Sequence, residues 1–328
     1  MGDTSIKEDY KFINSSKIGI RMKIMIGIFS YNEGKNLERM YYQIKQQCTN
    51  MQYEIVLVDE SDKQESLNIV DKIINKDNVR NICEKKKRMG KVHGYNVLYD
   101  SFLNSDCNIL LHFDADHLLS ENTISNLAVS IDSGYNIATC LNKPLKPKNL
   151  FQRILNVLIF PSIYLRETGE FKYPLVGHNG AYDRKAVQCI GEIPSGGSNE
   201  EIFVLGKTLQ NNLKYTIVTQ SICYYAQPFN INDYLASVKR SYSKAKTSVK
   251  MNPNMYQIQD AKGNQLNVLD LVYKPPSANI IITAVLSDPF ASLFVPFVIL
   301  VRWAAMNTVG ISTSETWDSI ESTKMLKI

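Results

Sequence analysis

The chain has 328 residues and a net charge of +5, from 37 Lys and Arg against 32 Asp and Glu; 44% of its residues are hydrophobic and 21% are charged. This composition excludes an intrinsically disordered chain, which has lower hydrophobicity and higher net charge. The six cysteines form no C-x-x-C spacing, which argues against a zinc knuckle or a compact disulfide framework.

Four strand-helix units follow a polar lead-in at residues 1–21. Apolar runs occupy 23–29, 53–59, 78–84 and 107–114, and each is followed by helical spacing, with the last helix expected over 118–131. Apolar strands that alternate with helices indicate a parallel sheet covered on both faces. The sequence therefore predicts an α/β fold with a doubly wound, mostly parallel sheet, whose nucleotide-binding half spans 22–140.

Polar side chains follow three of these strands where the strands end. They are Ser30, Tyr31 and Glu33 after the first strand, Asp59 and Glu60 after the second, and Asp114 and Asp116 after the fourth. Ligands of such sheets bind beyond the carboxyl ends of the strands. Several carboxylates at one edge concentrate negative charge, which a cation has to neutralise. We therefore expect a metal ion there. Neither a dinucleotide fingerprint nor a P-loop is present.

The Asp114-Ala115-Asp116 triplet is the best candidate for the metal ligands. Strand geometry sends both carboxylates to the same side of the chain. Such hard oxygen ligands suit Mn²⁺ or Mg²⁺ with positions left open for diphosphate oxygens. The alternative is that these aspartates only form a turn or cap a helix.

Six short blocks, taken in order, resemble the family 2 glycosyltransferases of GT-A fold. They are IFSYNEGKNL (28–37), VLVDESD (56–62), GKVHGYNVL (90–98), FDADHLL (113–119), GHNGAYDR (177–184) and EEIFVLGKTLQNNLKY (200–215). The resemblance implies a GT-A domain over 22–250, with an acceptor half at 141–250.

The resemblance also implies roles for individual residues. Donor binding would fall to Ser30, Tyr31, Glu33, Asp59, Lys91, Asp114 and Arg240, and metal binding to Asp116 and Asp114. Tyr31 has simple loop packing as its alternative. Glu60 stands where the family often has a second Asp, so its contact is left open.

Glu201, with Glu200 beside it, matches the acidic pair whose second member is the general base of inverting transfer in this family. A base near the acceptor hydroxyl takes its proton as the sugar is attacked. The alternative is structural, because Ser198-x-x-Glu201 is a capping box. His178 and Asn179 are the expected acceptor contacts. His93, His112 and His117 lack metal-site spacing, and a lone histidine is more often a packing residue; the alternative for His117 is a functional role, because it directly follows the Asp-Ala-Asp triplet.

A basic stretch at 238–250 includes Arg240 and Lys244, one helical turn apart. Its place after Glu201 is similar to the family region that lies over the donor diphosphate, where an arginine stabilises the leaving group. The alternative is a solvated or membrane-facing basic surface.

The C-terminal part differs in character from the rest of the chain. A polar linker at 251–274 precedes an apolar helical segment at 275–328, in which two apolar runs are separated by Asp288-Pro289. Residues 151–166 are similarly apolar with basic flanks. These segments are either a hydrophobic helical cap on the sheet or helices that lie on a membrane surface.

The sequence thus predicts an inverting glycosyltransferase that depends on Mn²⁺ or Mg²⁺. It would move a sugar from a nucleoside diphosphate, UDP first, to a hydroxyl acceptor such as a cell-envelope glycan, a lipid-linked precursor or a small molecule. No nucleic-acid motif is present, the oligomeric state is open, and the expected location is cytoplasmic, at the inner face of the membrane if the apolar helices bind lipid. The rival functions are a sugar nucleotidyltransferase, which needs a Gly-rich amino-terminal loop, and a catalytically silent binding protein.

Overall fold

The computed structural model describes residues 22–76, 79–82, 89–169, 179–195, 200–251, 257–259, 263, 265–267 and 277–308. The strands are β1 (Ile24–Ser30), β2 (Tyr53–Asp59), β3 (Val79–Asn81), β4 (Ile109–Asp114), β5 (Leu118–Leu119), β6 (Ile137–Pro144), β7 (Gly180–Asp183), β8 (Tyr215–Tyr225), β9 (Gln257–Gln259) and β10 (Gln265–Asn267). The helices are α1 (Lys35–Gln47), α2 (Gln64–Ile74), α3 (Lys91–Leu103), α4 (Thr123–Asp132), α5 (Leu150–Glu167), α6 (Arg184–Ile190), α7 (Glu200–Gln210), α8 (Ile231–Met251), α10 (Ala278–Ser287), α11 (Pro289–Ser292) and α12 (Val295–Thr308).

The described strands form one eight-stranded sheet in the order β3-β2-β1-β4-β7-β6-β8-β5, with β9 and β10 paired separately. Strands β3, β2, β1 and β4 are mutually parallel, and β6 is parallel to β8. Strand β7 is antiparallel to both β4 and β6, and β5 is antiparallel to β8. The predicted α/β class and mostly parallel sheet are therefore confirmed.

Helices cover both faces of the sheet because alternate residues of the central strands point to opposite sides. Ile24, Ile26 and Ile28 of β1 lie in a core with α1, α2 and α4. Met25 and Phe29 of the same strand lie in a second core with α3, α6 and α7. All seven residues of β1 are buried, which explains why this strand is apolar almost throughout instead of alternating.

Several element boundaries differ from the sequence prediction. The helix expected from residue 118 begins at Thr123, because Leu118 and Leu119 pair with β8 as the edge strand β5. The third strand, predicted over 78–84, is described at 79–81 and has ended at residue 82, and residues 78, 83 and 84 lie outside the described part of the chain. In the predicted polar linker, residues 257–259 and 265–267 pair as an antiparallel hairpin. The change at Leu118 and Leu119 arises from pairing with a distant strand, which local sequence patterns do not encode.

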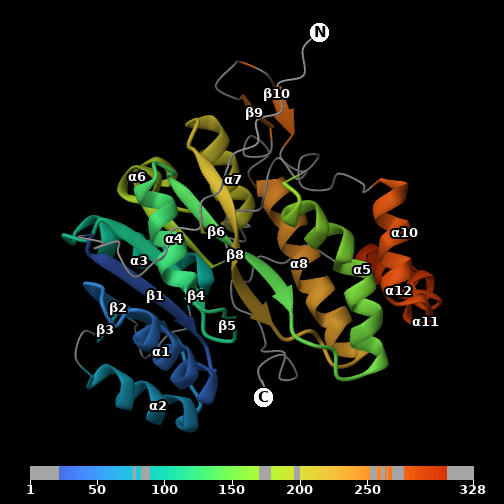
Figure 1. Cartoon of the computed structure of the whole chain (residues 1–328), viewed down its shortest axis with the longest axis horizontal. Coiled ribbons are helices and arrows are strands. Elements are labelled where there is room, and N and C mark those ends of the chain that lie inside the picture. Colours follow the sequence, from blue (N-terminus) through green and yellow to red (C-terminus); the bar gives the residue numbers. More distant parts are fainter. Residues whose placement is uncertain are drawn as a thin grey trace.

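The C-terminal helices α10, α11 and α12 lie beside α5 and α8, at the opposite end of the molecule from α1 and α2 (Figure 1). Ile154 and Leu155 of α5 share a small core with Ala284 and Ala291. Asp288 begins α11 by accepting a hydrogen bond from Ala291 N at 3.1 Å. None of the helices in the described ranges combines the length and the apolar character that crossing a membrane requires.

Candidate active site

The carboxyl ends of β1, β2 and β4 meet at one edge of the sheet. Ser30 is in register with Asp59, and Phe29 with Asp114. The Ala115 N–H donates to the Phe29 carbonyl at 2.9 Å, which holds the two strand ends together. Ser30 and Asp59 are buried, and in the described structure the Ser30 hydroxyl has no hydrogen-bond partner. This edge therefore places the buried Ser30 hydroxyl on the strand between those that carry Asp59 and Asp114.

The loops after β1 and β2 are locked together by Asn32, a residue that the sequence analysis did not assign. Asn32 adopts a left-handed backbone with φ of 55°, which asparagine tolerates better than most residues. Its N–H donates to Ser61 Oγ at 2.8 Å, and its Nδ2 donates to Asp62 at 2.7 Å. The Tyr31 hydroxyl donates to the same Asp62 at 3.2 Å. These hydrogen bonds therefore hold the loop that carries Tyr31 against the loop that follows Asp59.

Lys91, the first residue of α3, forms the closest contact with the Asp114 carboxylate. Its Nζ lies 2.8 Å and 2.9 Å from the two Asp114 oxygens, and it lies over the rings of Phe29 and Tyr95 at 5.8 Å. Burial alone lowers the pKa of Lys91, but the charges of Asp114 and Glu200 outweigh burial and raise the pKa above its usual value. Lys91 is therefore protonated, and its ammonium group lies beside Asp114 at the carboxyl edge of the sheet.

Glu60 holds the start of α3. Its carboxylate accepts hydrogen bonds from the N–H groups of Met89 at 3.1 Å and Gly90 at 3.0 Å. A carboxylate in this place satisfies unpaired donors of the helix and interacts well with the helix dipole. Glu60 therefore positions Lys91. Sequence reasoning missed this role because the partners are about thirty residues apart and share no motif.

Glu33 lies at the entrance of α1 and accepts a hydrogen bond from the Asn36 side chain at 3.2 Å. Its half-buried carboxylate also contributes to the electrostatic surroundings of Arg39. The structure thus brings the predicted donor residues Ser30, Tyr31, Glu33 and Asp59 to the same sheet edge as Asp114.

Asp116 and His117 complete a cluster of metal-ligating side chains with Asp114. One ligand atom from each of the three lies within 4.8 Å of the others. His117 Nδ1 is 2.9 Å from an Asp116 oxygen. Burial lowers the pKa of His117, but the adjacent Asp116 carboxylate raises it further, to a net value above the usual one. Two carboxylates and an imidazole are a donor set that fits Mn²⁺.

Three arginines lie in the electrostatic fields of acidic side chains of the site. Arg240 of α8 is half-buried; burial lowers its pKa, while Asp116 and Glu200 raise it. Arg240 therefore lies in the electrostatic field of Asp116 and Glu200, and its contact with a donor stays a prediction. Arg39 feels the charge of Asp116 and donates from Nη2 to the His117 carbonyl at 3.3 Å.

Arg166, near the end of α5, is the third of these arginines. Burial lowers its pKa, and the charge of Glu201 opposes that effect. The sequence analysis assigned neither Arg39 nor Arg166. Neither belongs to a motif in the sequence, so only the path of the chain brings Arg39 near Asp116 and Arg166 near Glu201.

Glu200 and Glu201 form the first turn of α7 and face the same region. Both carboxylates contribute to raising the pKa of Lys91. Glu200 is buried with 6% of its surface exposed, whereas Glu201 is half-buried. The capping box proposed for Glu201 involves Ser198, which lies outside the described residues.

The two predicted acceptor residues differ in what can be said of them. His178 lies outside the described part of the chain. Asn179 is 1% exposed; its Oδ1 accepts from Asp114 N at 3.1 Å, and its Nδ2 donates to Asn142 Oδ1 at 3.3 Å. The Asn179 side chain therefore supports the end of β4 from within the sheet, and its contact with an acceptor stays a prediction.

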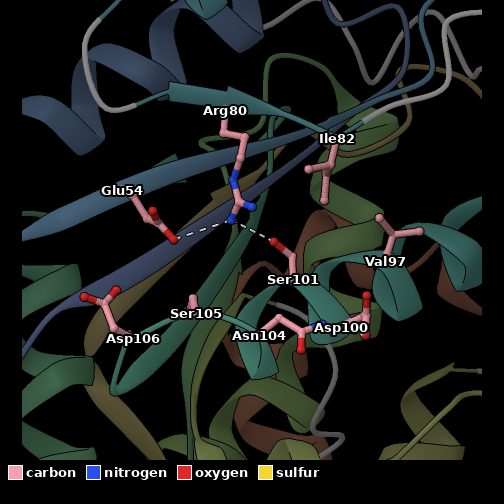
Figure 2. Close-up of a pocket in the computed structure, with 9 residues that line it drawn as sticks. All are labelled: Glu54, Arg80, Ile82, Val97, Asp100, Ser101, Asn104, Ser105 and Asp106. Carbon is pink, nitrogen blue, oxygen red and sulfur yellow. Dashed lines mark hydrogen bonds and ion pairs between the residues drawn. The ribbon is translucent and has the colours of Figure 1, made fainter.

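A separate cavity of about 680 Å³ lies at the amino edge of the sheet, opposite to this site (Figure 2). Its walls include Glu54 near the start of β2 and Asp106 just before β4. Arg80 crosses it and lies 3.5 Å from Glu54 and 2.8 Å from the Ser101 hydroxyl. Because Arg80 is already paired and the cavity lies away from the carboxylate cluster, we assign it no part in the candidate active site.

Comparison with known proteins agrees with this geometry. A family model described as Glycosyl transferase family 2 matches residues 25–191, about half of the chain. The chain belongs to this family. The match includes the Asp114-Ala115-Asp116 triplet and ends before Glu200.

Solved structures of glycosyltransferases share the GT-A fold of this family 2 chain. The mannosyltransferase PcManGT from Pyrobaculum calidifontis, in complex with GDP-Man and Mn²⁺, matches with a TM-score of 0.54 and 15% identity, over 87% of this chain and 74% of that chain. Glucosyl-3-phosphoglycerate synthase from Mycobacterium tuberculosis, in complex with Mn²⁺, UDP and glucosyl-3-phosphoglycerate, has a TM-score of 0.49 and 15% identity, over 74% and 82% of the two chains. A search of curated proteins found no match.

Proposed function

We propose that this family 2 glycosyltransferase transfers a sugar from a nucleoside diphosphate to a hydroxyl acceptor, with inversion at the sugar and with the help of Mn²⁺ or Mg²⁺. The observation that carries the proposal is the cluster of Asp114, Asp116 and His117 beside the Lys91 ammonium. An acidic cluster surrounded by cations suits a ligand that is itself a complex of a diphosphate with a divalent metal.

Asp114, Asp116 and His117 would hold the metal ion. Bound there, the ion would neutralise charge on the diphosphate and make it a better leaving group. Lys91, which contacts Asp114, and Arg240, which lies in the field of Asp116, would bind the diphosphate oxygens. Arg240 also stabilises the negative charge that develops as the sugar departs.

Residues at the ends of β1 and β2 bind the nucleoside. The Tyr31 ring offers an aromatic surface for the base, and Asp59 offers hydrogen-bond acceptors. The buried Ser30 hydroxyl, which has no partner in the described structure, lies at the same strand end. UDP remains our first choice of nucleotide, and GDP, which is bound as GDP-Man in the PcManGT structure, is the alternative.

Glu201 acts as the general base. Its half-buried carboxylate takes the proton of the acceptor hydroxyl while that oxygen attacks the anomeric carbon and the bond from this carbon to the diphosphate breaks. A single displacement of this kind inverts the configuration of the sugar. Glu200, which is more deeply buried, is the alternative base.

Calorimetric titration of UDP and GDP, with and without Mn²⁺, tests this proposal. We expect one nucleotide to bind much more tightly with the metal than without it. Asp116→Asn preserves shape but removes the ligand charge, so it should weaken metal-dependent binding by about tenfold or more. Asp132→Asn, an exposed change of the same type at the end of α4, is the matched control and should bind normally.

Unchanged affinity of Asp116→Asn in the presence of Mn²⁺ would overturn the metal assignment. A protein that binds the nucleotide and Mn²⁺ but releases no sugar from any nucleotide-sugar donor would instead be a silent binding protein. Release of pyrophosphate from a nucleoside triphosphate and a sugar phosphate would identify a nucleotidyltransferase.

A further inference from the structure

Large apolar side chains are concentrated on the outer side of α10, α11 and α12. The described residues contain fifteen exposed large hydrophobic side chains, and eleven of them lie between Ile281 and Trp303. The most exposed are Leu293 at 74%, Leu286 at 69%, Trp303 at 62% and Leu300 at 61%. We call this surface the apolar face. Monomeric soluble proteins rarely expose a continuous apolar patch of this extent, which usually marks a binding surface.

The inner side of the same helices carries smaller residues. Ala284, Ala291 and Ala305 are buried, together with Ile280 and Val298. The helices therefore place alanines against α5 and α8 and leave leucines and phenylalanines outside. A hydrophobic cap made to shield the sheet from water would do the reverse, because burying the larger side chains yields more stabilisation. The arrangement indicates an apolar environment outside the helices.

The segment that forms the apolar face has a net positive charge once the ion pair of Asp288 is taken into account. Between residues 277 and 308, Asp288 and Arg302 are the ionisable acidic and basic groups. Arg153 neutralises Asp288 through two hydrogen bonds of 2.7 Å and 2.8 Å. Arg302 therefore contributes the net charge of the segment, and it lies next to the exposed Trp303.

Further cations lie where α5 begins. Lys146 and Lys148 are exposed just before this helix, and Leu150 beside them is an exposed apolar residue. Arg153, one turn further along α5, contacts Asp288 and so connects this basic stretch to the break between α10 and α11. The apolar face is thus bordered by basic side chains.

We propose that the apolar face docks on the surface of a lipid bilayer that contains anionic lipids. The three helices lie along the interface, with their large side chains among the ends of the acyl chains. Trp303 and the bordering cations lie at the level of the headgroups, where each Lys or Arg gains from anionic lipid. Self-association suits the surface less well, because a symmetric pair of this chain would bring two sets of like charges together.

This docking is independent of the reaction proposed above, but α5 connects the two regions. Ile154 and Leu155 near its start pack beneath the C-terminal helices, and Arg166 near its end lies in the field of Glu201. Helix α5 would therefore connect the membrane-bound surface with the region of Glu201, the candidate general base.

Flotation of the full-length chain with vesicles tests the proposal. The vesicles contain equal parts of phosphatidylcholine and phosphatidylglycerol, and the wild-type chain should float with them. The triple variant Leu286→Glu, Leu293→Glu, Leu300→Glu should partition at least about a hundredfold less, because three exposed apolar side chains no longer enter the interface. Tyr42→Glu, at a side chain 54% exposed on α1 at the other end of the molecule, is the matched control and should float like the wild type.

A spectroscopic measurement avoids dependence on the folding of the triple variant. In a Trp317→Phe background, Trp303 is the single tryptophan. Its emission should shift to shorter wavelength on addition of the vesicles and should be quenched by brominated lipids. A wild-type chain that stays at the bottom of the gradient, a folded triple variant that floats normally, or Trp303 emission that does not change would each overturn the proposal. If the wild-type chain does not float but forms dimers, and the triple variant is a monomer, the apolar face is a surface for self-association instead.

Discussion

Glu200 and Glu201 are neighbours in sequence but occupy different electrostatic settings. Both lie in the field of Lys91, but Glu200 is buried and also lies in the field of Arg240, whereas Glu201 is half-buried and lies in the field of Arg166. A general base has to contact the acceptor, so the more accessible carboxylate is better suited to this role. Glu200 is better placed to balance the charges of Lys91 and Arg240.

We therefore expect Glu201→Gln to lower turnover by about 10² or more, because glutamine keeps the shape of the side chain but takes no proton. Its thermal unfolding and its affinity for the nucleotide should stay near wild-type values, as measured by calorimetry. Glu200→Gln serves as the comparison variant. If Glu201→Gln retains nearly full turnover while Glu200→Gln loses it, the base is Glu200.

His117 shows how a residue type acquires a different meaning from its surroundings. As a lone histidine with no metal-site spacing, it is more often a packing residue, with a functional role as the alternative. In the structure its ring nitrogen lies within reach of Asp116, and the two side chains form a ligand cluster with Asp114. The adjacency of His117 to the aspartates was the available signal, and spacing rules drawn from other metal sites did not capture it.

Contacts between elements decide how the donor site is held. The link from the end of β2 to the start of α3 consists of the Glu60 carboxylate and the two N–H groups before Lys91. The first residue of α3 thus has its ammonium fixed by Asp114 and its helix fixed by Glu60. Lys91 is therefore positioned before any ligand arrives, which lowers the entropic cost of binding.

Glu60→Ala should lower the free energy of unfolding by about 1 kcal/mol, as expected for loss of a helix cap. It should also weaken metal-dependent nucleotide binding, because Lys91 loses its fixed position. Thermal unfolding and calorimetric titration measure the two effects. Glu65→Ala removes the same charge from the exposed first turn of α2 and should leave binding unchanged. A less stable Glu60→Ala variant with normal nucleotide affinity would limit Glu60 to capping the helix.

Across the whole molecule, β7 joins the two halves of the fold. It pairs with β4 of the parallel group β3-β2-β1-β4 on one side and with β6, which is parallel to β8, on the other. Gly180 at its start faces the backbone of β6, and a Cβ there would lie 2.8 Å from the Ala138 carbonyl oxygen. Because the obstacle is backbone within the sheet, it has little freedom to move away.

Gly180→Ala should therefore destabilise the entire sheet, by about 1–3 kcal/mol, and lower the temperature of a single cooperative unfolding transition. Gly94→Ala is the matched control. Its Cβ would meet side-chain atoms of Val58 and Phe29 at 2.9 Å and 3.1 Å, and alanine favours the helix in which it lies. We expect the smaller effect at Gly94. Equal melting temperatures for Gly180→Ala and the wild type would show that β6 and β7 are able to separate at this point.

The sequence by itself was sufficient for the features that depend on neighbouring residues. The apolar runs that became β1, β2 and β4 predicted the parallel part of the sheet, because a strand buried on both faces has no polar alternation. The ordered blocks around Asp59, Asp114 and Glu201 predicted the family, which the match over residues 25–191 confirms. The break at Asp288-Pro289 was also visible, since proline begins a helix more readily than it continues one.

Only the tertiary structure decided which distant residues meet. Leu118 and Leu119 have helix-like neighbours in sequence, yet they pair with residues more than a hundred positions away in β8. The fold brings partners that are distant in sequence to Glu60, Arg39 and Arg166. Hydrophobic periodicity predicts local secondary structure and does not predict such long-range contacts. The sequence showed that 275–306 is apolar, but it did not show which side chains would be buried. In the structure the alanines are buried and the leucines are exposed. The inner positions lie close against α5 and α8, where small side chains fit.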